Sequence, residues 1–390
     1  MTCSILTCTA LKVCRAEANV AINSSVSISM SNQPPFIRAA GSHREIGLTI
    51  GRAMGGLIRQ QVAVYQKLIE QDTTINISWQ QAVLQARKYL PFAEEFYPQY
   101  VDELMGIAEG SGADLGDVLT LNTMEAITSD ALFLKCTSLA VGSEVTESGA
   151  GVIVAHNEDW LPEDKPCVYV AQIEPDDEPP FLTLSYGALL PNLGFNTCGV
   201  AHVADSVYPN DVRLGIPRII FTRAILGART LGQAIQAAIH RRRDAGYNHL
   251  IAGEHGEIYC IEASATAYDA LYADDHWTAH TNHYTSATMR SYEEKPEALV
   301  NSRVRYNRAR HLVKGRLGKL TVADFQTFLA DHINYPYSIC AHVESAESPL
   351  DSTITIASII MDMAVRTMWV CWGNPCQGTY YPYRLETKRA

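Results

Sequence analysis

The sequence predicts a layered α+β protein, and three features of its hydrophobic pattern support this class. Apolar residues recur at helical spacing through the first third of the 390-residue chain. From Cys136 onward, short strand-like segments joined as hairpins predominate. Further helical segments separate these strands without strict strand–helix–strand alternation, which favours a layered α+β domain over a parallel α/β sheet.

One strand and several helices are expected before residue 136. A strand is predicted at 35–42. Ser42 and Glu45 then have the spacing of a capping box, so a helix is expected to begin there. Apolar residues recur at helical spacing from Ile46 to Ile69. Later helices are predicted over 78–90, 99–109 and 114–128.

The rest of the chain is expected to contain strands with helices between them. Residues 136–141 and 151–156 predict a hairpin across a polar loop that contains glycine. Further strands are predicted near 168–170, 182–186, 199–204, 247–253, 257–262, 268–273, 353–362, 367–372 and 380–385, and helices over 217–226, 231–241, 303–314 and 322–332. No linker divides the region 35–390, so a single domain is predicted there. Residues 1–34 lack helical or strand periodicity and are expected to form a disordered tail.

Composition excludes several classes of partner. The formal net charge is -11 at pH 7, which argues against nucleic acid or an anionic membrane, because both reward clustered Lys and Arg. No window approaches the roughly 18 to 20 consecutive apolar residues of a membrane span. Neither nucleic acid nor a membrane is therefore expected as a partner.

The cysteines indicate a reducing compartment. Ten cysteines are scattered through the chain without dense spacing, which favours free thiols and a cytoplasmic location. Cys371 and Cys376 lack the second ligand pair of a zinc site, so no metal is predicted. The N-terminal stretch is a poor signal peptide. It remains open to two interpretations, a transit peptide or a true start at Met30.

Three chemical groups stand out as a possible acyl-transfer site. Cys136 lies in K-C-T-S-L-A-V-G, where the helical part gives way to strands. A thiolate is a strong nucleophile, but it needs a base or a lowered pKa to act near neutral pH. Asp159 follows in H-N-E-D-W and Asn282 lies in H-T-N-H. Taken alone, these residues are better explained as an inert buried cysteine, a turn or cap carboxylate and a strand-end hydrogen bonder.

Two histidines flank the amide. His280 and His283 are three residues apart, a spacing that could hold zinc on a helix. They lie in a short extended stretch instead, so structural or pocket-lining roles are favoured. A Cys136–His pair of the papain type is the enzymatic alternative, but the papain signature around the cysteine is missing.

The motifs together resemble the acyl-coenzyme A:isopenicillin N acyltransferase family of N-terminal nucleophile hydrolases. The resemblance covers roughly 36–385. Besides the segments around Cys136 and Asp159, the blocks that carry it, in family order, are H-R-E-I-G (43–47), D-V-L-T-L-N-T (117–123), G-F-N-T-C-G-V (194–200), H-T-N-H (280–283) and N-Y-P-Y-S-I-C (334–340).

The resemblance implies a four-layer αββα sandwich and a proenzyme that cuts itself before its nucleophile. The cut would fall between Lys135 and Cys136 and leave chains 1–135 and 136–390 as a heterodimer. The freed α-amine of Cys136, with an ordinary pKa of about 7.7–8.0, would then act as base for its own thiol. The resemblance assigns Asp159 to orienting this amine and Asn282 to the oxyanion.

The expected activity is hydrolysis or acyl transfer at the amide of a small N-acyl amine, through a thioester. No cofactor is expected, with an acyl-coenzyme A as the one candidate acyl donor. Contacts to substrate are assigned to Asn157, Tyr186 and His283. Two alternatives remain: a catalytically silent member of the fold that binds ligands, and a conventional Cys/His hydrolase that does not cut itself.

Two positions depart from the family. Lys135 stands where the fungal acyltransferases have glycine before the nucleophile. The stretch 348–355 has no arginine, although these relatives carry a functional arginine shortly before the late strand. The bulkier Lys135 is expected to slow cleavage or change its conditions, and the missing arginine favours an N-acyl amine other than a penicillin as the substrate.

Overall fold

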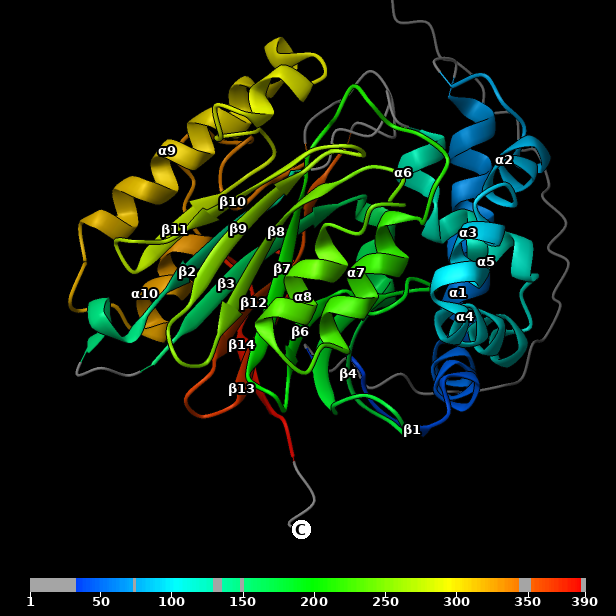
Figure 1. The fold of residues 1–390 in the computed structure, drawn as a ribbon, viewed down its shortest axis with the longest axis horizontal. Helices are drawn as coiled ribbons and strands as arrows, with labels where there is room; N and C mark the ends of the chain where they lie inside the picture. The colour runs from blue at the N-terminus through cyan, green and yellow to red at the C-terminus, as the bar shows by residue number, and fades with distance from the viewer. Residues whose placement is uncertain (1–32, 73–74, 129–134, 148–150, 344–351, 387–390) are drawn as a thin grey trace, which may run out of the picture. The chain divides into compact units, whose positions relative to one another are not determined.

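The computed structural model describes residues 33–72, 75–128, 135–147, 151–343 and 352–386 (Figure 1). Residues Asn32–Ala390 form one compact unit. The predicted tail, 1–34, lies almost wholly outside the described residues. No helix in the described ranges has the length and apolar character that crossing a membrane requires.

The N-terminal part is a strand followed by helices, as predicted. The capping box at Ser42 and Glu45 is present: the Ser42 side chain accepts from the Glu45 N–H, and the Glu45 carboxylate accepts from the Ser42 N–H. Ser78 and Gln81 form a second capping box. The elements are β1 (Phe36–Gly41), α1 (His43–Gln71), α2 (Trp79–Ala86), α3 (Leu90–Phe96), α4 (Pro98–Ser111), α5 (Leu115–Asn122) and α6 (Met124–Ile127).

Some helix boundaries differ from the prediction for local reasons. The predicted helix 78–90 ends earlier, at Ala86. A separate helix that was not predicted, α3, begins at Leu90 with Pro91 in its first turn, where the missing N–H is tolerated. The predicted helix 114–128 breaks at Thr123, whose hydroxyl donates to the carbonyl of Leu119 and competes with the helix ladder. Helix α4 continues through Gly110 and ends at Gly112, which adopts the left-handed conformation.

Helices α1 and α4 approach each other closely through glycine. A Cβ added at Gly47 would overlap the Glu103 carbonyl oxygen, and one added at Gly106 would overlap the Arg44 carbonyl oxygen. These glycines allow the backbones of α1 and α4 to pack in direct contact.

The strands form two sheets. An eight-stranded sheet has the order β1-β4-β5-β6-β7-β8-β9-β10, and a six-stranded sheet has the order β11-β2-β3-β12-β13-β14. The β1–β4 pair is parallel, and every other named pair is antiparallel. The bounds are β2 (Thr137–Val141), β3 (Ile153–Trp160), β4 (Val168–Pro175), β5 (Phe181–Tyr186), β6 (Leu193–Asn196), β7 (Val200–Ser206), β8 (Tyr247–Gly253), β9 (Ile258–Ala263), β10 (Tyr268–Tyr272), β11 (Trp277–His280), β12 (Ile354–Asp362), β13 (Thr367–Trp372) and β14 (Tyr380–Arg384).

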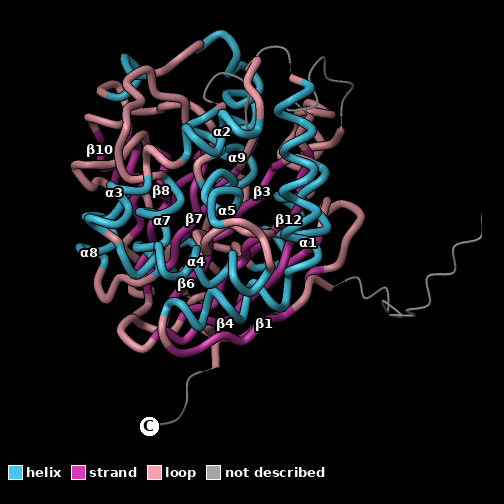
Figure 2. Tube along the Cα trace, turned by 90° about the vertical axis from the view of Figure 1, so that its right-hand side faces the viewer, coloured by secondary structure: helices cyan, strands magenta, loops and turns pink. Residues whose placement is uncertain are grey.

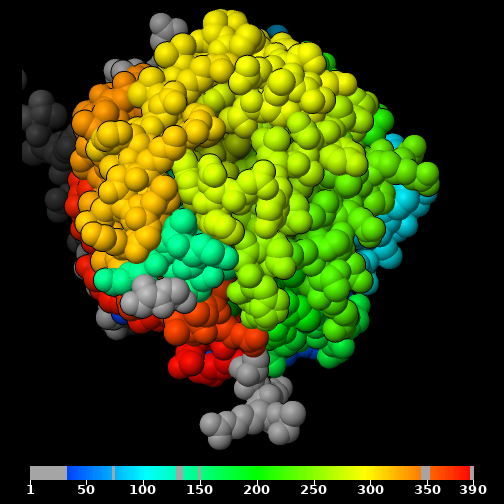
Figure 3. Space-filling model, turned by 60° about the vertical axis from the view of Figure 1, so that its left-hand side comes forward, coloured from blue at the N-terminus to red at the C-terminus, as the bar shows by residue number. Residues whose placement is uncertain are grey.

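Helices cover the outer face of each sheet. Helices α1, α4 and α5 pack with α7 (Arg218–Leu226) and α8 (Leu231–Ala238) on the eight-stranded sheet (Figure 2). Helices α9 (Val300–Lys314) and α10 (Val322–Leu329) pack on the six-stranded sheet and form much of the surface in Figure 3, in yellow and orange. The inner faces of the two sheets meet, with β2 and β3 against β7. The predicted four-layer αββα sandwich is confirmed.

Candidate active site

Sheet pairing brings Cys136 and Asn282 together. Cys136 directly precedes β2, and β2 pairs with β11 so that Ser138 lies opposite His280. Two residues further along this antiparallel register, the backbone N–H of Cys136 donates to Asn282 Oδ1 at 2.9 Å. Cys136 is 3% exposed and Asn282 1% exposed. Two residues that are 146 positions apart thus share one buried hydrogen bond.

The thiol of Cys136 lies in a buried, negatively charged environment. Burial raises its pKa well above the ordinary value, and the carboxylates of Glu158, Asp159 and Asp205 raise it further. Glu158 Oε2 lies 4.0 Å from Sγ. The thiol is therefore protonated in the uncut chain, and it needs a nearby base to react.

Adjacent residues of β3 project to opposite faces of the sheet, so the carboxylates of Glu158 and Asp159 lie on different faces. Glu158 points toward the eight-stranded sheet, where Oε1 accepts from the Tyr186 hydroxyl at 2.9 Å. Its other oxygen lies 2.8 Å from His156 Nε2. Asp159 points the other way and accepts from the Thr355 hydroxyl at 2.5 Å.

Asp159 faces a positive charge beneath the sheet. Burial raises the pKa of its carboxyl to about 7, although the charge of Arg305 and the Thr355 hydrogen bond oppose this shift. Arg305, from α9, is 1% exposed. Its guanidinium donates to the Cys136 carbonyl oxygen at 2.5 Å, to Thr137 Oγ1 at 2.9 Å and to Asn282 Oδ1 at 2.6 Å. One side chain thus fixes both the backbone of Cys136 and the side-chain amide of Asn282.

A chain of buried polar groups continues from Glu158 between the sheets. Ser138 Oγ lies 2.9 Å from His156 Nδ1 and donates to Asp205 Oδ1 at 2.8 Å. His280 lies between Asp205 and Glu262, at 3.3 and 3.0 Å. Burial lowers the pKa of His280, but these two carboxylates outweigh it and raise the pKa to about 9. His280 is therefore a protonated partner of two acids and is unsuited to act as a base near pH 7.

A small cavity of about 20 Å³ lies beside the thiol, enough for about one water molecule. Its walls are mainly apolar and aromatic, with Glu158 as the acidic group. The lining residues are Cys136, Glu158, Trp160, Tyr186, Asn192, Leu193, Ala204, Ser206, Ile219 and Tyr247. Tyr186, one of the predicted substrate contacts, is among them.

Asn157 and His283, the other predicted substrate contacts, are not among the residues that line this cavity. The Asn157 amide donates to the carbonyls of Leu329 and Ile339 at 2.9 and 2.8 Å, so it ties β3 to the segment after α10. His283 Nδ1 lies 2.8 Å from Ser302 Oγ, and burial lowers its pKa to about 3. Both side chains are engaged with protein groups.

Sequence reasoning did not select Glu158 or Arg305. Glu158 was visible beside Asp159 in N-E-D, and strand alternation would have placed it on the face of the thiol. Arg305 had no such signal, because it is one of several arginines on α9 and only packing buries it.

The family model described as acyl-coenzyme A:6-aminopenicillanic acid acyl-transferase matches residues 145–377, more than half of the chain. The chain belongs to this family. It is similar to the 40 kDa form of acyl-coenzyme A:6-aminopenicillanic-acid-acyltransferase from Emericella nidulans, with 24% identity over 343 residues, 87% of this chain and 92% of the relative. It is also similar to the β-alanyl-dopamine/carcinine hydrolase of Drosophila melanogaster, with 22% identity over 376 residues, 88% of this chain and 94% of the relative.

Solved structures also show similarity. A mutant conjugated bile acid hydrolase from Clostridium perfringens aligns with a TM-score of 0.42 and 12% identity, covering 65% of this chain and 99% of that one. Penicillin V acylase from Agrobacterium tumefaciens aligns with a TM-score of 0.37 and 10% identity, covering 61% and 83%.

Proposed function

We propose that this protein is a cysteine amidohydrolase or acyltransferase that cuts itself between Lys135 and Cys136 and then uses Cys136 as its N-terminal nucleophile. The observation that carries the proposal is the hydrogen bond from the Cys136 N–H to Asn282 Oδ1, at the wall of a buried cavity. The atom that would become the free α-amine is held beside an amide and close to its own thiol. A merely structural cysteine would not need this arrangement.

Self-cleavage begins with addition of the Cys136 sulfur to the Lys135 carbonyl carbon. Glu158 is in reach to accept the thiol proton, since its Oε2 is 4.0 Å from Sγ. The Lys135–Cys136 C–N bond breaks, the nitrogen takes up a proton, and a thioester links Lys135 to the sulfur. Water then hydrolyses the thioester, leaving a carboxylate on Lys135, a thiol and a free α-amine.

The mature enzyme repeats the same chemistry on an external amide. The α-amine, with an ordinary pKa of about 7.7–8.0, takes the thiol proton. Sulfur attacks the acyl carbon, and the oxyanion is stabilised by the Asn282 Nδ2, which also donates to the Ser206 carbonyl. The amine product leaves and a thioester remains. Water gives hydrolysis, and an amine acceptor gives transfer.

The substrate class is a small N-acyl amine, whose acyl group would pack against the apolar and aromatic side chains beside the thiol, among them Trp160, Tyr186 and Tyr247. The named activities of the two relatives, penicillin acyl transfer and hydrolysis of β-alanyl amides, support this class. The chemistry requires no cofactor, and an acyl-coenzyme A enters only as an acyl donor in transfer. The cytoplasm remains the proposed location, in line with unpaired thiols at the described cysteines.

Intact mass under denaturing conditions tests the proposal. Wild-type protein should give two fragments that meet between Lys135 and Cys136 and whose masses sum to the full chain plus one water. The Cys136→Ala chain should stay whole. A single uncut wild-type chain after prolonged incubation would refute self-cleavage and favour a silent binding protein.

A second mechanism uses a histidine base without cleavage. The reactive atoms of Cys136, His156 and Glu158 all lie within 4.8 Å of one another, so His156 is the histidine in reach, rather than His280 or His283. Under this mechanism the uncut chain would hydrolyse N-acyl amines, and His156→Gln would abolish that activity.

A further inference from the structure

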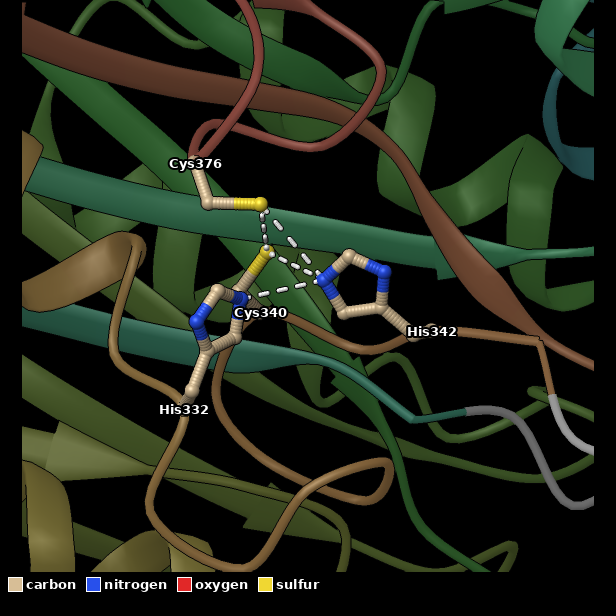
Figure 4. A group of neighbouring side chains, drawn as sticks. All are labelled: His332, Cys340, His342 and Cys376. Atoms are coloured by element: carbon tan, nitrogen blue, oxygen red, sulfur yellow. Dashed lines mark hydrogen bonds between the residues drawn. The ribbon is translucent and has the colours of Figure 1, made fainter.

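Four potential metal ligands converge outside the active site. His332 follows α10, Cys340 and His342 lie in the segment that precedes β12, and Cys376 lies in the turn between β13 and β14. One nitrogen or sulfur from each lies within 4.8 Å of all the others. Figure 4 shows the two thiols and the His342 ring nitrogen pointing toward one another, with a His332 nitrogen beside them.

Four of the six separations among these ligand atoms are close to the edges of a tetrahedron around one ion. The two Sγ atoms are 3.6 Å apart, His342 Nε2 is 3.5 Å from each of them, and the two histidine Nε2 atoms are 3.0 Å apart. Zinc bonds of about 2.3 Å to sulfur and about 2.0–2.1 Å to nitrogen give edges of roughly 3.8, 3.6 and 3.3 Å in a regular tetrahedron. The four separations in the structure lie within a few tenths of an ångström of these values, and both sulfur atoms lie within 4.8 Å of a His332 nitrogen.

A disulfide between Cys340 and Cys376 would account for less of this geometry. It needs sulfur atoms about 2.05 Å apart, whereas these two are 3.6 Å apart. It would also leave unexplained the two imidazole nitrogens directed at the same point. Two thiolates with two imidazoles are the soft, tetrahedral donor set that selects zinc over magnesium or calcium.

We propose that His332, Cys340, His342 and Cys376 bind one structural Zn²⁺ ion. With four protein ligands the site is closed and leaves no position for a substrate. Asn374 supports it from outside the ligand set: its Nδ2 lies 3.5 Å from Cys340 Sγ and donates to the Ala341 carbonyl at 2.6 Å. Such outer contacts fix the orientation of a ligand.

The ion would hold a segment that touches the active site. Ala341, between two ligands, donates its N–H to Thr355 Oγ1 at 3.0 Å, and that hydroxyl donates to Asp159. Tyr337, in the same segment, has the Lys135 ammonium 4.5 Å from its ring centre. If the proposed self-cleavage holds, the zinc ion thereby helps to position Lys135, which precedes the cut, and the carboxylate of Asp159.

Metal content of the uncut Cys136→Ala chain tests zinc binding independently of cleavage. Protein purified under reducing conditions should carry one zinc per chain by elemental mass spectrometry. The Cys340→Ser variant should lose it. If that variant fails to fold, His332→Ala, at an exposed ligand, should lower retention of zinc against a chelator. Cys198→Ser, at an exposed cysteine outside the cluster, should keep full occupancy.

Cobalt gives a second readout. Co²⁺ added to the metal-free protein should produce the visible bands of a four-coordinate ion and a sulfur-to-metal band in the near ultraviolet, both absent from Cys340→Ser. Protein that binds neither Zn²⁺ nor Co²⁺ at one per chain, with its thiols reduced, would overturn the site. Self-cleavage of the wild type that is equally fast with and without zinc would overturn the positioning role alone.

Discussion

Replacing Arg305 by methionine should strongly destabilise the fold, because the guanidinium is buried beneath Cys136. The side chain is 1% exposed and donates to the Cys136 carbonyl, to Thr137 and to Asn282. Its charge also lowers the pKa of Asp159. Removing one partner of a buried charged arrangement typically costs about 3–5 kcal/mol, because the remaining groups stay buried without compensation. We expect a loss of that size in the free energy of unfolding.

Urea unfolding should be measured in the uncut Cys136→Ala background, so that chain cleavage does not alter the baseline. Arg308→Met is the matched control on the same helix. Arg308 pairs with Asp331 at 2.6 Å, but its side chain is 26% exposed, so its loss should cost no more than about 1 kcal/mol. Equal destabilisation by the two substitutions would refute the reasoning. With Cys136 restored, Arg305→Met should also slow self-cleavage, since the carbonyl and amide around the nucleophile lose their shared donor.

Three further predictions concern buried contacts elsewhere in the chain. Asn282→Ala should slow self-cleavage by about 10²–10³-fold in a mass-spectrometric time course, since it removes an oxyanion donor, whereas an unchanged rate would remove Asn282 from the mechanism. Gly47→Ala should destabilise the protein by about 2 kcal/mol or more in urea, because the new Cβ meets the Glu103 carbonyl; Gly56→Ala, where nothing lies within 4 Å, should instead stabilise it by about 0.5–1 kcal/mol. Burial raises the pKa of Asp164 to about 7, above its unfolded value, so its contribution to stability is present in acid and lost as pH rises. Between about pH 4 and about pH 7 the wild type should lose roughly 2–4 kcal/mol relative to Asp164→Asn, and parallel pH profiles would contradict this.

Local sequence signals predicted the secondary structure well. The capping boxes at Ser42 and Ser78, and the hairpin that begins at Cys136, act over a few residues, and the structure contains them. Besides the local errors at Pro91 and Thr123, one error arises where packing between distant segments determines the structure. Gly110, which resembles a helix end in sequence, lies inside α4 because α1 requires a residue without a side chain there.

The site residues also fall into those that local sequence predicts and those that depend on the three-dimensional structure. The segments around Cys136, Asp159 and Asn282 were recognisable because each is a short motif of adjacent residues. That Glu158 shares the face of the thiol while Asp159 lies behind the sheet follows from strand alternation once β3 is known to extend to Trp160. The predicted strand ended at residue 156, so the opposite orientations of Glu158 and Asp159 could not be predicted from it.

Patterns of adjacent residues were enough to predict the fold class and the family, and they singled out Cys136 as the proposed nucleophile. Only the tertiary structure chose Arg305 from the arginines of α9 and gathered His332, Cys340, His342 and Cys376 around one point. Cys376 was paired with Cys371 in sequence, but its sulfur lies beside that of Cys340, 36 positions away. Burial of a charge and convergence of ligands depend on how separate segments pack, and no local pattern of residues encodes them.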